Sequence, residues 1–151
     1  MNLLEPSEFM VSPPTSTNGG APTVRLTIPA KAEYITLVRL ALSGLSQSRE
    51  LPDETLGDLK LAVTEACSNS IRHAYTDGRE GSVEVVYELH PDRLVVEVCD
   101  DGPGFSTNGS NPGSGLVNMR DRIEAVGGEL AIRSRPGAGT EIIGRIPVVS
   151  P

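Results

Sequence analysis

Hydrophobic residues alternate with polar residues in five segments of the chain, and this two-residue period is typical of strands with one buried face. Three other segments repeat their hydrophobic residues every three or four positions, which predicts helices. The stripe of the second helix, for example, contains Leu59, Val63, Cys67 and Ser70. In chain order the predicted elements are a strand at 24–29, helices at 32–48 and 52–75, strands at 82–89 and 93–99, a helix at 116–126, and strands at 129–134 and 140–148.

The single hydrophobic face of each predicted strand means that helices are needed on only one side of the sheet. We therefore expect an α/β (α+β) two-layer sandwich, in which helices cover one face of a mixed, mostly antiparallel sheet. Residues 1–22 have no periodicity and are rich in proline and small polar residues, so we expect a disordered tail there. Residues 23–148 then form one domain, because 151 residues are enough for one domain and too few for two.

The charge and composition exclude several classes of protein. The chain has 13 basic and 20 acidic residues and a formal net charge of -7, which argues against a nucleic-acid partner or an anionic membrane surface. No hydrophobic run approaches the roughly 18 residues of a membrane-spanning helix, and no basic segment begins a signal peptide. The two cysteines, Cys67 and Cys99, are too few for a disulfide framework or a zinc site. We expect a soluble, cytoplasmic protein.

Three polar residues of the second predicted helix, Glu65, Asn69 and His73, are spaced four apart and form a ridge beside its hydrophobic stripe. Such a ridge can be an ordinary solvated helix face. It can also carry chemistry, because an amide oxygen such as that of Asn69 is a suitable ligand for Mg²⁺. The carboxylate of Glu65, one turn away, could orient or deprotonate a nucleophile.

An Asp-x-Gly-x-Gly segment, residues 100–104, directly follows a predicted strand. Asp100 has the same parity as the hydrophobic residues of that strand, so its side chain should emerge on the helix-covered side. A carboxylate there could accept a hydrogen bond from the amine of adenine, and Gly102 and Gly104 would let the backbone pass close to a flat base. The alternative is a simple Asp-Gly turn.

A third segment, Gly113-Ser114-Gly115-Leu116, opens the last predicted helix. Glycines at a helix start expose backbone N–H groups that can hold phosphates. The segment lacks the lysine of a P-loop and the strand–turn–helix context of a dinucleotide-binding fingerprint. Taken alone, it could equally be a flexible connector.

Together with Gly139-Thr140 in the last hairpin, these segments resemble the sequence boxes of the Bergerat-fold (GHKL) ATPases, the superfamily of gyrase, histidine kinases and MutL. The resemblance covers about residues 23–148. The first half, above all residues 60–75 (KLAVTEACSNSIRHAY), is very similar to the anti-sigma factor serine/threonine kinases of bacterial stress and sporulation switches. The second half, from Gly115 to Gly128, resembles the ATPase domains of small histidine kinases. No arginine lies between Asp101 and Gly115, where some anti-sigma kinases place one near the γ-phosphate.

The resemblance implies a role for each matching residue. Glu65 would be the general base toward a serine hydroxyl, and Asn69 would bind Mg²⁺. Asp100 would accept the hydrogen bond of adenine, with Thr140 supporting it. The remaining ATP-binding residues would be Gly102 and Gly104 at the base, Gly113, Gly115 and Leu116 at the phosphates, and His73, for which a structural or solvated role is the alternative.

The resemblance also implies a function. The chain would use ATP and Mg²⁺ to phosphorylate a serine of an anti-sigma factor antagonist protein, and would otherwise sequester a sigma factor, as a homodimer that regulates transcription in a stress response. Two other functions remain open. One is a detached histidine-kinase-like catalytic domain, and the other is a non-catalytic, ATP-gated binding module.

Overall fold

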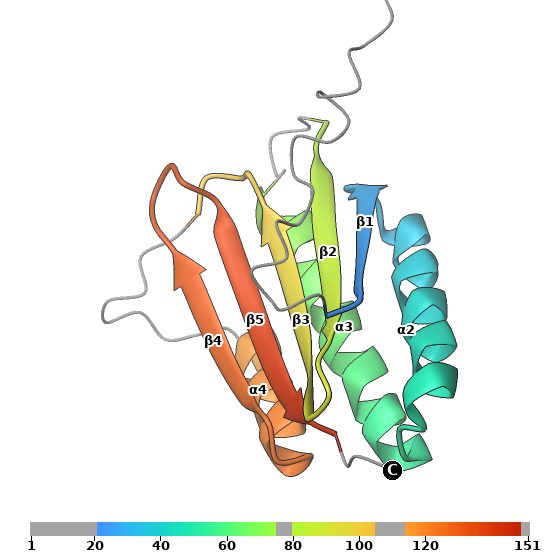
Figure 1. Cartoon of the computed structure of the whole chain (residues 1–151). Helices are drawn as coiled ribbons and strands as arrows, with labels where there is room; N and C mark the ends of the chain where they lie inside the picture. The colour runs from blue at the N-terminus through green and yellow to red at the C-terminus, as the bar shows by residue number, and fades with distance from the viewer. Residues whose placement is uncertain (1–20, 75–79, 105–113, 149–151) are drawn as a thin grey trace, which may run out of the picture.

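The structure is a computed structural model that describes residues 21–74, 80–104 and 114–148, without the side chains of residues 73, 74 and 114. Five strands form one sheet in the order β1-β2-β3-β5-β4, and all four neighbouring pairs are antiparallel (Figure 1). The strands are β1 (Thr23–Pro29), β2 (Ser82–Leu89), β3 (Arg93–Asp100), β4 (Glu129–Ser134) and β5 (Thr140–Pro147). The helices are the short 3-10 helix η1 (Ala32–Tyr34), α2 (Ile35–Arg49), α3 (Asp53–Ala74) and α4 (Ser114–Ala125).

The predicted order of strands and helices and the two-layer sandwich are confirmed. Two details differ from the prediction. The first predicted helix is divided into η1 and α2, because the backbone makes a tighter turn before Ile35. The sheet is fully antiparallel and not mixed, because β5 lies between β3 and β4 and pairs antiparallel with both. The strands β3 and β4 therefore run in the same direction without touching each other.

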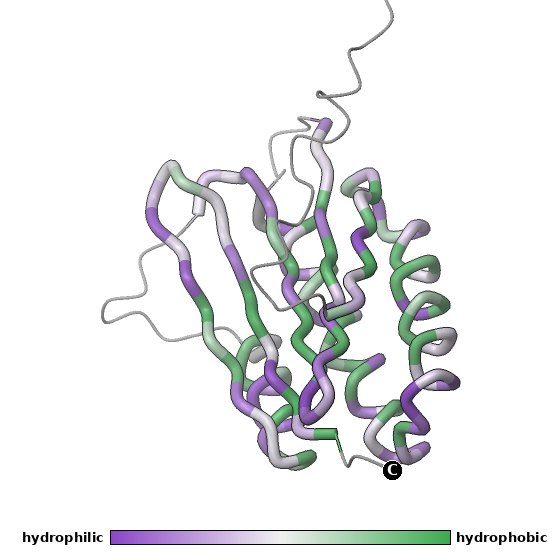
Figure 2. Tube along the Cα trace, viewed as in Figure 1, coloured by the Kyte–Doolittle hydropathy of each residue, from purple (hydrophilic) through white to green (hydrophobic). Residues whose placement is uncertain are grey.

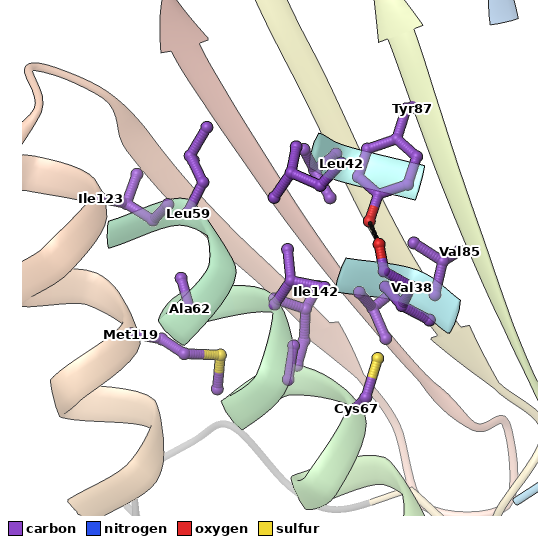
Figure 3. Packing of buried hydrophobic residues seen from close by; sticks show 14 of the residues in the cluster. Val38, Leu42, Leu59, Ala62, Cys67, Val85, Tyr87, Met119, Ile123 and Ile142 are labelled. Carbon is purple, nitrogen blue, oxygen red and sulfur yellow. Dashed lines mark hydrogen bonds between the residues drawn. The ribbon is translucent and has the colours of Figure 1, made fainter. Parts of the chain in front are cut away.

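The hydrophobic core lies between the sheet and the layer formed by α2, α3 and α4 (Figure 1). Hydrophobic and hydrophilic residues alternate along the strands, as Figure 2 shows, so each strand presents one face to the helices. Figure 3 shows side chains of all three helices packed against those of the sheet. The hydroxyl of Tyr87 on β2 donates a hydrogen bond of 2.9 Å to the backbone oxygen of Val38, which joins α2 to the sheet inside this core.

Two contacts show that α3 and α4 run antiparallel. Near the start of α3, the carboxylate of Asp58 pairs at 3.3 Å with Arg122, which lies near the end of α4. Seven residues later in α3, the carboxylate of Glu65 lies beside Gly115 at the beginning of α4. The last turns of α3 therefore point toward the region where α4 begins.

One end of the sheet, which we call the site end, is formed by Pro29, Ser82, Asp100, Ser134 and Thr140. At the opposite end, Gly127 and Gly128 follow α4 and lie against Pro147 and Arg145 of β5. Because α4 finishes at that opposite end, its beginning and the last turns of α3 lie toward the site end (Figure 1). Within the described ranges, none of the helices has the length and hydrophobicity that crossing a membrane requires.

Candidate functional site

Asp100 and Thr140 lie directly opposite each other, at the last position of β3 and the first of β5. Both side chains are on the helix-covered face, since they share the parity of the buried residues of their strands. The Oδ1 atom of Asp100 accepts a hydrogen bond of 3.0 Å from the backbone N–H of Gly102. This local bond orients the carboxylate at the site end, on the side that the strand pattern predicted.

The hydroxyl of Thr140 is buried and lies 2.9 Å from the hydroxyl of Ser134, the last residue of β4. Ser134 also donates a hydrogen bond of 3.2 Å to the backbone oxygen of Gly139. Ser134 was not among the residues predicted from sequence. Its pairing with Thr140 depends on the register between β4 and β5, which the alternating pattern of β4 alone does not specify.

The loop that follows β3 packs against the turn between β4 and β5. The backbone N–H of Gly137 in that turn donates a hydrogen bond of 2.5 Å to the oxygen of Pro103. Gly104 and Gly139 have φ angles of 67° and 79°, and a Cβ on either would overlap a carbonyl group, that of Arg135 or that of Asp100 respectively. The backbone therefore requires glycine at both positions.

A depression of about 710 Å³ lies at the same end of the sheet. Of the residues predicted for the site, Asp100 and Thr140 line it. Its remaining lining residues, Cys99, Ile132, Arg133, Ser134, Arg135, Ala138, Gly139 and Glu141, come from β3, β4, β5 and the turn between the last two.

Glu65, the first residue of the predicted polar ridge on α3, lies beside the start of α4. A Cβ built on Gly115 would lie 2.9 Å from the Oε2 atom of Glu65, so only a residue without a side chain leaves the carboxylate its present place. Asn69, one turn further along α3, is 9% exposed. The structure thus brings together the predicted general base and the predicted phosphate-binding segment, which are fifty positions apart in the sequence.

Three of the predicted residues need separate comment. Leu116 is 7% exposed and belongs to the hydrophobic core, so its side chain anchors the first turn of α4 to the protein interior. Gly113 lies outside the described residues. His73 belongs to α3, and its side chain is likewise outside what the structure describes.

A family of histidine kinase-like ATPase domains matches residues 28–146 of the chain. The chain belongs to this family. Its fold is also similar to the histidine kinase domain of the blue-light activated histidine kinase EL346 from Erythrobacter litoralis, with a TM-score of 0.61 and 26% identity. That alignment covers 80% of this chain and 62% of the other.

Curated relatives of this histidine kinase-like ATPase domain carry the name serine-protein kinase RsbW. The protein from Listeria innocua is 42% identical over 82 residues, which are 54% of this chain and 52% of that protein. The protein from Bacillus licheniformis is 37% identical over 101 residues, which are 67% of this chain and 63% of that protein. The chain therefore spans about half to less than two thirds of the length of these relatives.

The two cysteines of the domain are poor nucleophiles. Burial raises the pKa of the Cys67 thiol to about 12. Burial, and then the negative charges of Glu141 and Glu97, raise the pKa of the Cys99 thiol to about 12 as well. Because the thiolate is the reactive and metal-binding form, both groups are inert near neutral pH.

The same reasoning applies to the one group of metal-binding side chains found among the described residues. The ligand atoms of Glu97, Cys99 and Glu141 lie within 4.8 Å of one another on the face of the sheet opposite the helices. Burial also raises the pKa of Glu97, reinforced by Glu141 and then Glu88. This group lies on the other side of the sheet from Asn69, so it is separate from the metal ligand that the sequence predicted.

Proposed function

We propose that this ATPase domain binds ATP with Mg²⁺ and phosphorylates a serine of a partner protein. The observation that carries the proposal is the closeness of Glu65 to Gly115: a Cβ built on Gly115 would lie 2.9 Å from the Oε2 atom of Glu65, so a carboxylate lies beside the first turn of α4. A serine hydroxyl and the γ-phosphate must meet in just such a place, between a base and a phosphate-binding helix start. The names of the relatives, serine-protein kinase, favour serine as the acceptor.

The residues at the site end fit a nucleotide. Asp100 offers an oriented carboxylate on the helix-covered face, which suits the amine of adenine. Gly115 leaves the start of α4 without a side chain, so that a phosphate can approach its backbone N–H groups. The amide oxygen of Asn69, one turn from Glu65, suits a Mg²⁺ ion, which neutralises phosphate charge when bound.

In this proposal some residues of the chain bind the nucleotide and one residue transfers the proton. Asp100 positions the adenine, and the backbone N–H groups at the start of α4 position the phosphates. Glu65 accepts the proton of the serine hydroxyl as the bond from the serine oxygen to the γ-phosphorus forms and the bond from that phosphorus to the β–γ bridging oxygen breaks, which releases ADP. Asn69 would hold the metal, which would neutralise phosphate charge. General-base assistance of this kind typically contributes about 10²–10⁴-fold to the rate.

The partners are proposed from the resemblance of residues 60–75 to anti-sigma factor kinases. We propose that the phosphorylated protein is an anti-sigma factor antagonist. In its other state the chain sequesters a sigma factor in the cytoplasm as a homodimer and so regulates transcription under stress. Phosphorylation inactivates the antagonist and leaves the kinase able to bind the sigma factor.

A second function, transfer of phosphate to a histidine of another protein, is favoured by the similarity to the EL346 kinase domain. A third is an ATP-gated binding module without catalysis. Incubation with γ-labelled ATP and candidate partners separates the three, because phosphoserine is stable in acid and phosphohistidine is not. Acid-stable label on the partner supports the proposal, acid-labile label supports the second function, and ATP binding without label supports the third.

The variant Glu65→Gln sharpens this experiment, because it keeps the shape of the side chain but cannot take up a proton. We expect unchanged ATP affinity and phosphotransfer reduced by about 10²–10⁴-fold. Such a protein would still bind the sigma factor but would no longer inactivate the antagonist. Phosphotransfer close to that of the unaltered protein would show that Glu65 is not the base.

A further inference from the structure

Three hydrophobic side chains lie on the face of the sheet opposite the helices, which we call the outer face. Val86, Val95 and Ile143 have the opposite parity to the core residues of their strands, and they do not belong to the hydrophobic cluster between sheet and helices. All three α-helices pack on the other side (Figure 1). An antiparallel sheet with one solvated face usually carries polar residues there. These three residues are instead only 3%, 6% and 3% exposed.

The strand register brings these side chains together in the middle of the outer face. Glu97 of β3 is paired with Val86 of β2 on one side and with Ile143 of β5 on the other. Ala131 of β4 is paired in turn with Ile143, and Val95 precedes Glu97 by two positions on the same face. Hydrophobic side chains from four neighbouring strands therefore surround one carboxylate.

Two titratable groups of the outer face are shielded from water as well. Burial is the first cause of the raised pKa of Glu97 and of the raised pKa of the Cys99 thiol. Removal from water raises the pKa of an acidic group because it disfavours the charged form. The buried hydrophobic residues and these two groups both indicate that the outer face is covered, although none of the described helices lies over it.

The N-terminal segment, residues 1–20, lies outside the described residues and joins the sheet where it can reach this face. The backbone N–H of Leu89 at the end of β2 donates a hydrogen bond of 2.9 Å to the oxygen of Pro22, just before β1. Phe9 is thirteen residues before Pro22, and an extended chain of that length spans roughly 40 Å. Five strands spaced about 4.8 Å apart extend over only about 20 Å, so the segment is long enough to cross the sheet.

The same segment contains hydrophobic residues that could cover the outer face. Leu3 and Leu4 form one group, and Phe9, Met10 and Val11 form another. Burying such side chains is worth about 1.5–3 kcal/mol each, which favours a hydrophobic contact over exposure to water. The composition of residues 1–22 predicted a disordered tail, but that prediction concerned proline and small polar residues and left these hydrophobic groups without a partner.

We propose that residues 1–20 fold back over the outer face and pack Phe9, Met10 and Val11 against its hydrophobic centre. The segment then occupies a surface of Val86, Val95 and Ile143 that would otherwise be open to a second copy of the chain. Association through the outer face would first require the segment to leave it. This inference concerns the side of the sheet away from the candidate nucleotide site and does not depend on the proposed function.

A fluorescent reporter tests whether the segment is packed. The chain contains no tryptophan, so Phe9→Trp introduces a single emitting group. We expect its emission to be shifted to shorter wavelength, and its quenching by iodide to be several-fold weaker, relative to the same variant unfolded in guanidinium chloride. Emission and quenching equal to those of the unfolded variant would overturn the proposal.

The reactivity of Cys99 tests whether the packed segment covers the outer face. In a full-length variant with Phe9→Asp and Val11→Asp, two charges oppose packing, and we expect alkylation of Cys99 at pH 8 to be about tenfold faster, the effect of one unit in thiol pKa. The matched control carries Thr15→Asp and Thr17→Asp, which add the same charge outside the hydrophobic group and should leave the rate unchanged. Cys67 lies in the core on the helix side and should stay unreactive in both variants, which shows that the domain is folded.

Measurements at several protein concentrations distinguish the segment from a second copy. Under the proposal, the protection of Cys99 is independent of concentration and is lost with Phe9→Asp and Val11→Asp. Protection that increases with concentration and survives these substitutions would mean that a second copy covers the outer face. An equal rate in the variant and the unaltered chain at every concentration would mean that neighbouring side chains alone bury the face. Either result would overturn the proposal.

Discussion

The carboxylate of Glu65 lies 2.9 Å from the position that a Cβ would take on Gly115, so a side chain at Gly115 would force this carboxylate, the flexible end of the glutamate, to move. A carboxylate near the first turn of a helix is favoured by the helix dipole. The contact therefore fixes where the proposed base lies relative to the proposed phosphate-binding segment. It also makes Gly115 a sensitive position for a substitution.

Gly115→Ala should impair phosphotransfer without unfolding the protein. The added methyl group displaces the carboxylate of Glu65, and a shift of about 1 Å in a catalytic group can cost roughly 100-fold in rate. The helix itself should not suffer, because alanine is a better helix former than glycine. Phosphotransfer assays and thermal unfolding test both parts.

Gly57→Ala is the matched control for that substitution. Gly57 is also helical, in α3, but no atom lies within 4 Å of the position of its added Cβ. We expect this variant to gain about 0.5–1 kcal/mol of stability and to keep full activity. If both variants lose activity alike, or if Gly115→Ala is fully active, the contact with Glu65 has no part in catalysis.

Asp100→Asn should weaken ATP binding by about 5–150-fold while the fold remains intact. The amide oxygen of asparagine can still accept the hydrogen bond from Gly102, so the local turn is preserved. Its NH₂ group, however, would oppose the amine of adenine, at a cost on the order of 1–3 kcal/mol for mispaired buried groups. Unchanged ATP affinity by calorimetry, with normal thermal unfolding, would remove Asp100 from the site.

The role proposed for Asn69 predicts an effect that depends on metal. Asn69→Ala removes the amide oxygen, so affinity for ATP in the presence of Mg²⁺ should fall. Affinity measured in EDTA should change much less. Equal losses under the two conditions would mean that this nearly buried residue supports the end of α3 and does not bind an ion.

The thiol of Cys99 should react slowly with alkylating reagents at pH 8. Burial and neighbouring carboxylates raise its pKa from an ordinary value of 9.0 to about 12. A higher pKa leaves less of the reactive thiolate, so alkylation should be about a thousandfold slower than for a free thiol. Reaction at the rate of a free thiol would contradict the raised pKa.

Glu141→Gln tests the cause of that shift, because it removes the largest charge effect on Cys99. The pKa should fall and the rate at pH 8 should rise, as measured by mass spectrometry of the Cys99 peptide. Glu129→Gln removes an exposed carboxylate of β4 that is not among the causes of the shift, and it should leave the rate unchanged.

The pattern of single strands predicted most of the fold, because period and parity are local properties of the sequence. The bounds of β2 and β4 agree with the prediction, and the parity of β3 placed Asp100 on the correct face. The position of β5 between β3 and β4 could not be predicted from the patterns of single strands. Parity shows which face of a strand is buried, but not which strand lies beside it.

For Glu65, Asn69 and Asp100, the residue type and its place in an element suggested a chemistry, and those roles stay predictions. A residue's place in the site was harder to predict where that place depends on a contact between segments that are distant in the sequence. Gly104 was expected to make room for a base, whereas the structure shows it packed against the backbone of Arg135. Ser134, which pairs with Thr140, was missed, because a small polar residue at a strand end has no distinctive signal until its neighbours are known.

The placement of β5 links the site to the folding of the whole domain. Thr140 can face Asp100 only after the last strand in the sequence has inserted between two earlier ones, and such long-range pairing tends to make folding slow. Until β5 inserts, β4 has no neighbouring strand, and β3 is paired only with β2. A chain still emerging from the ribosome therefore has no complete candidate site, and under the proposed function nucleotide binding would report that all five strands have paired.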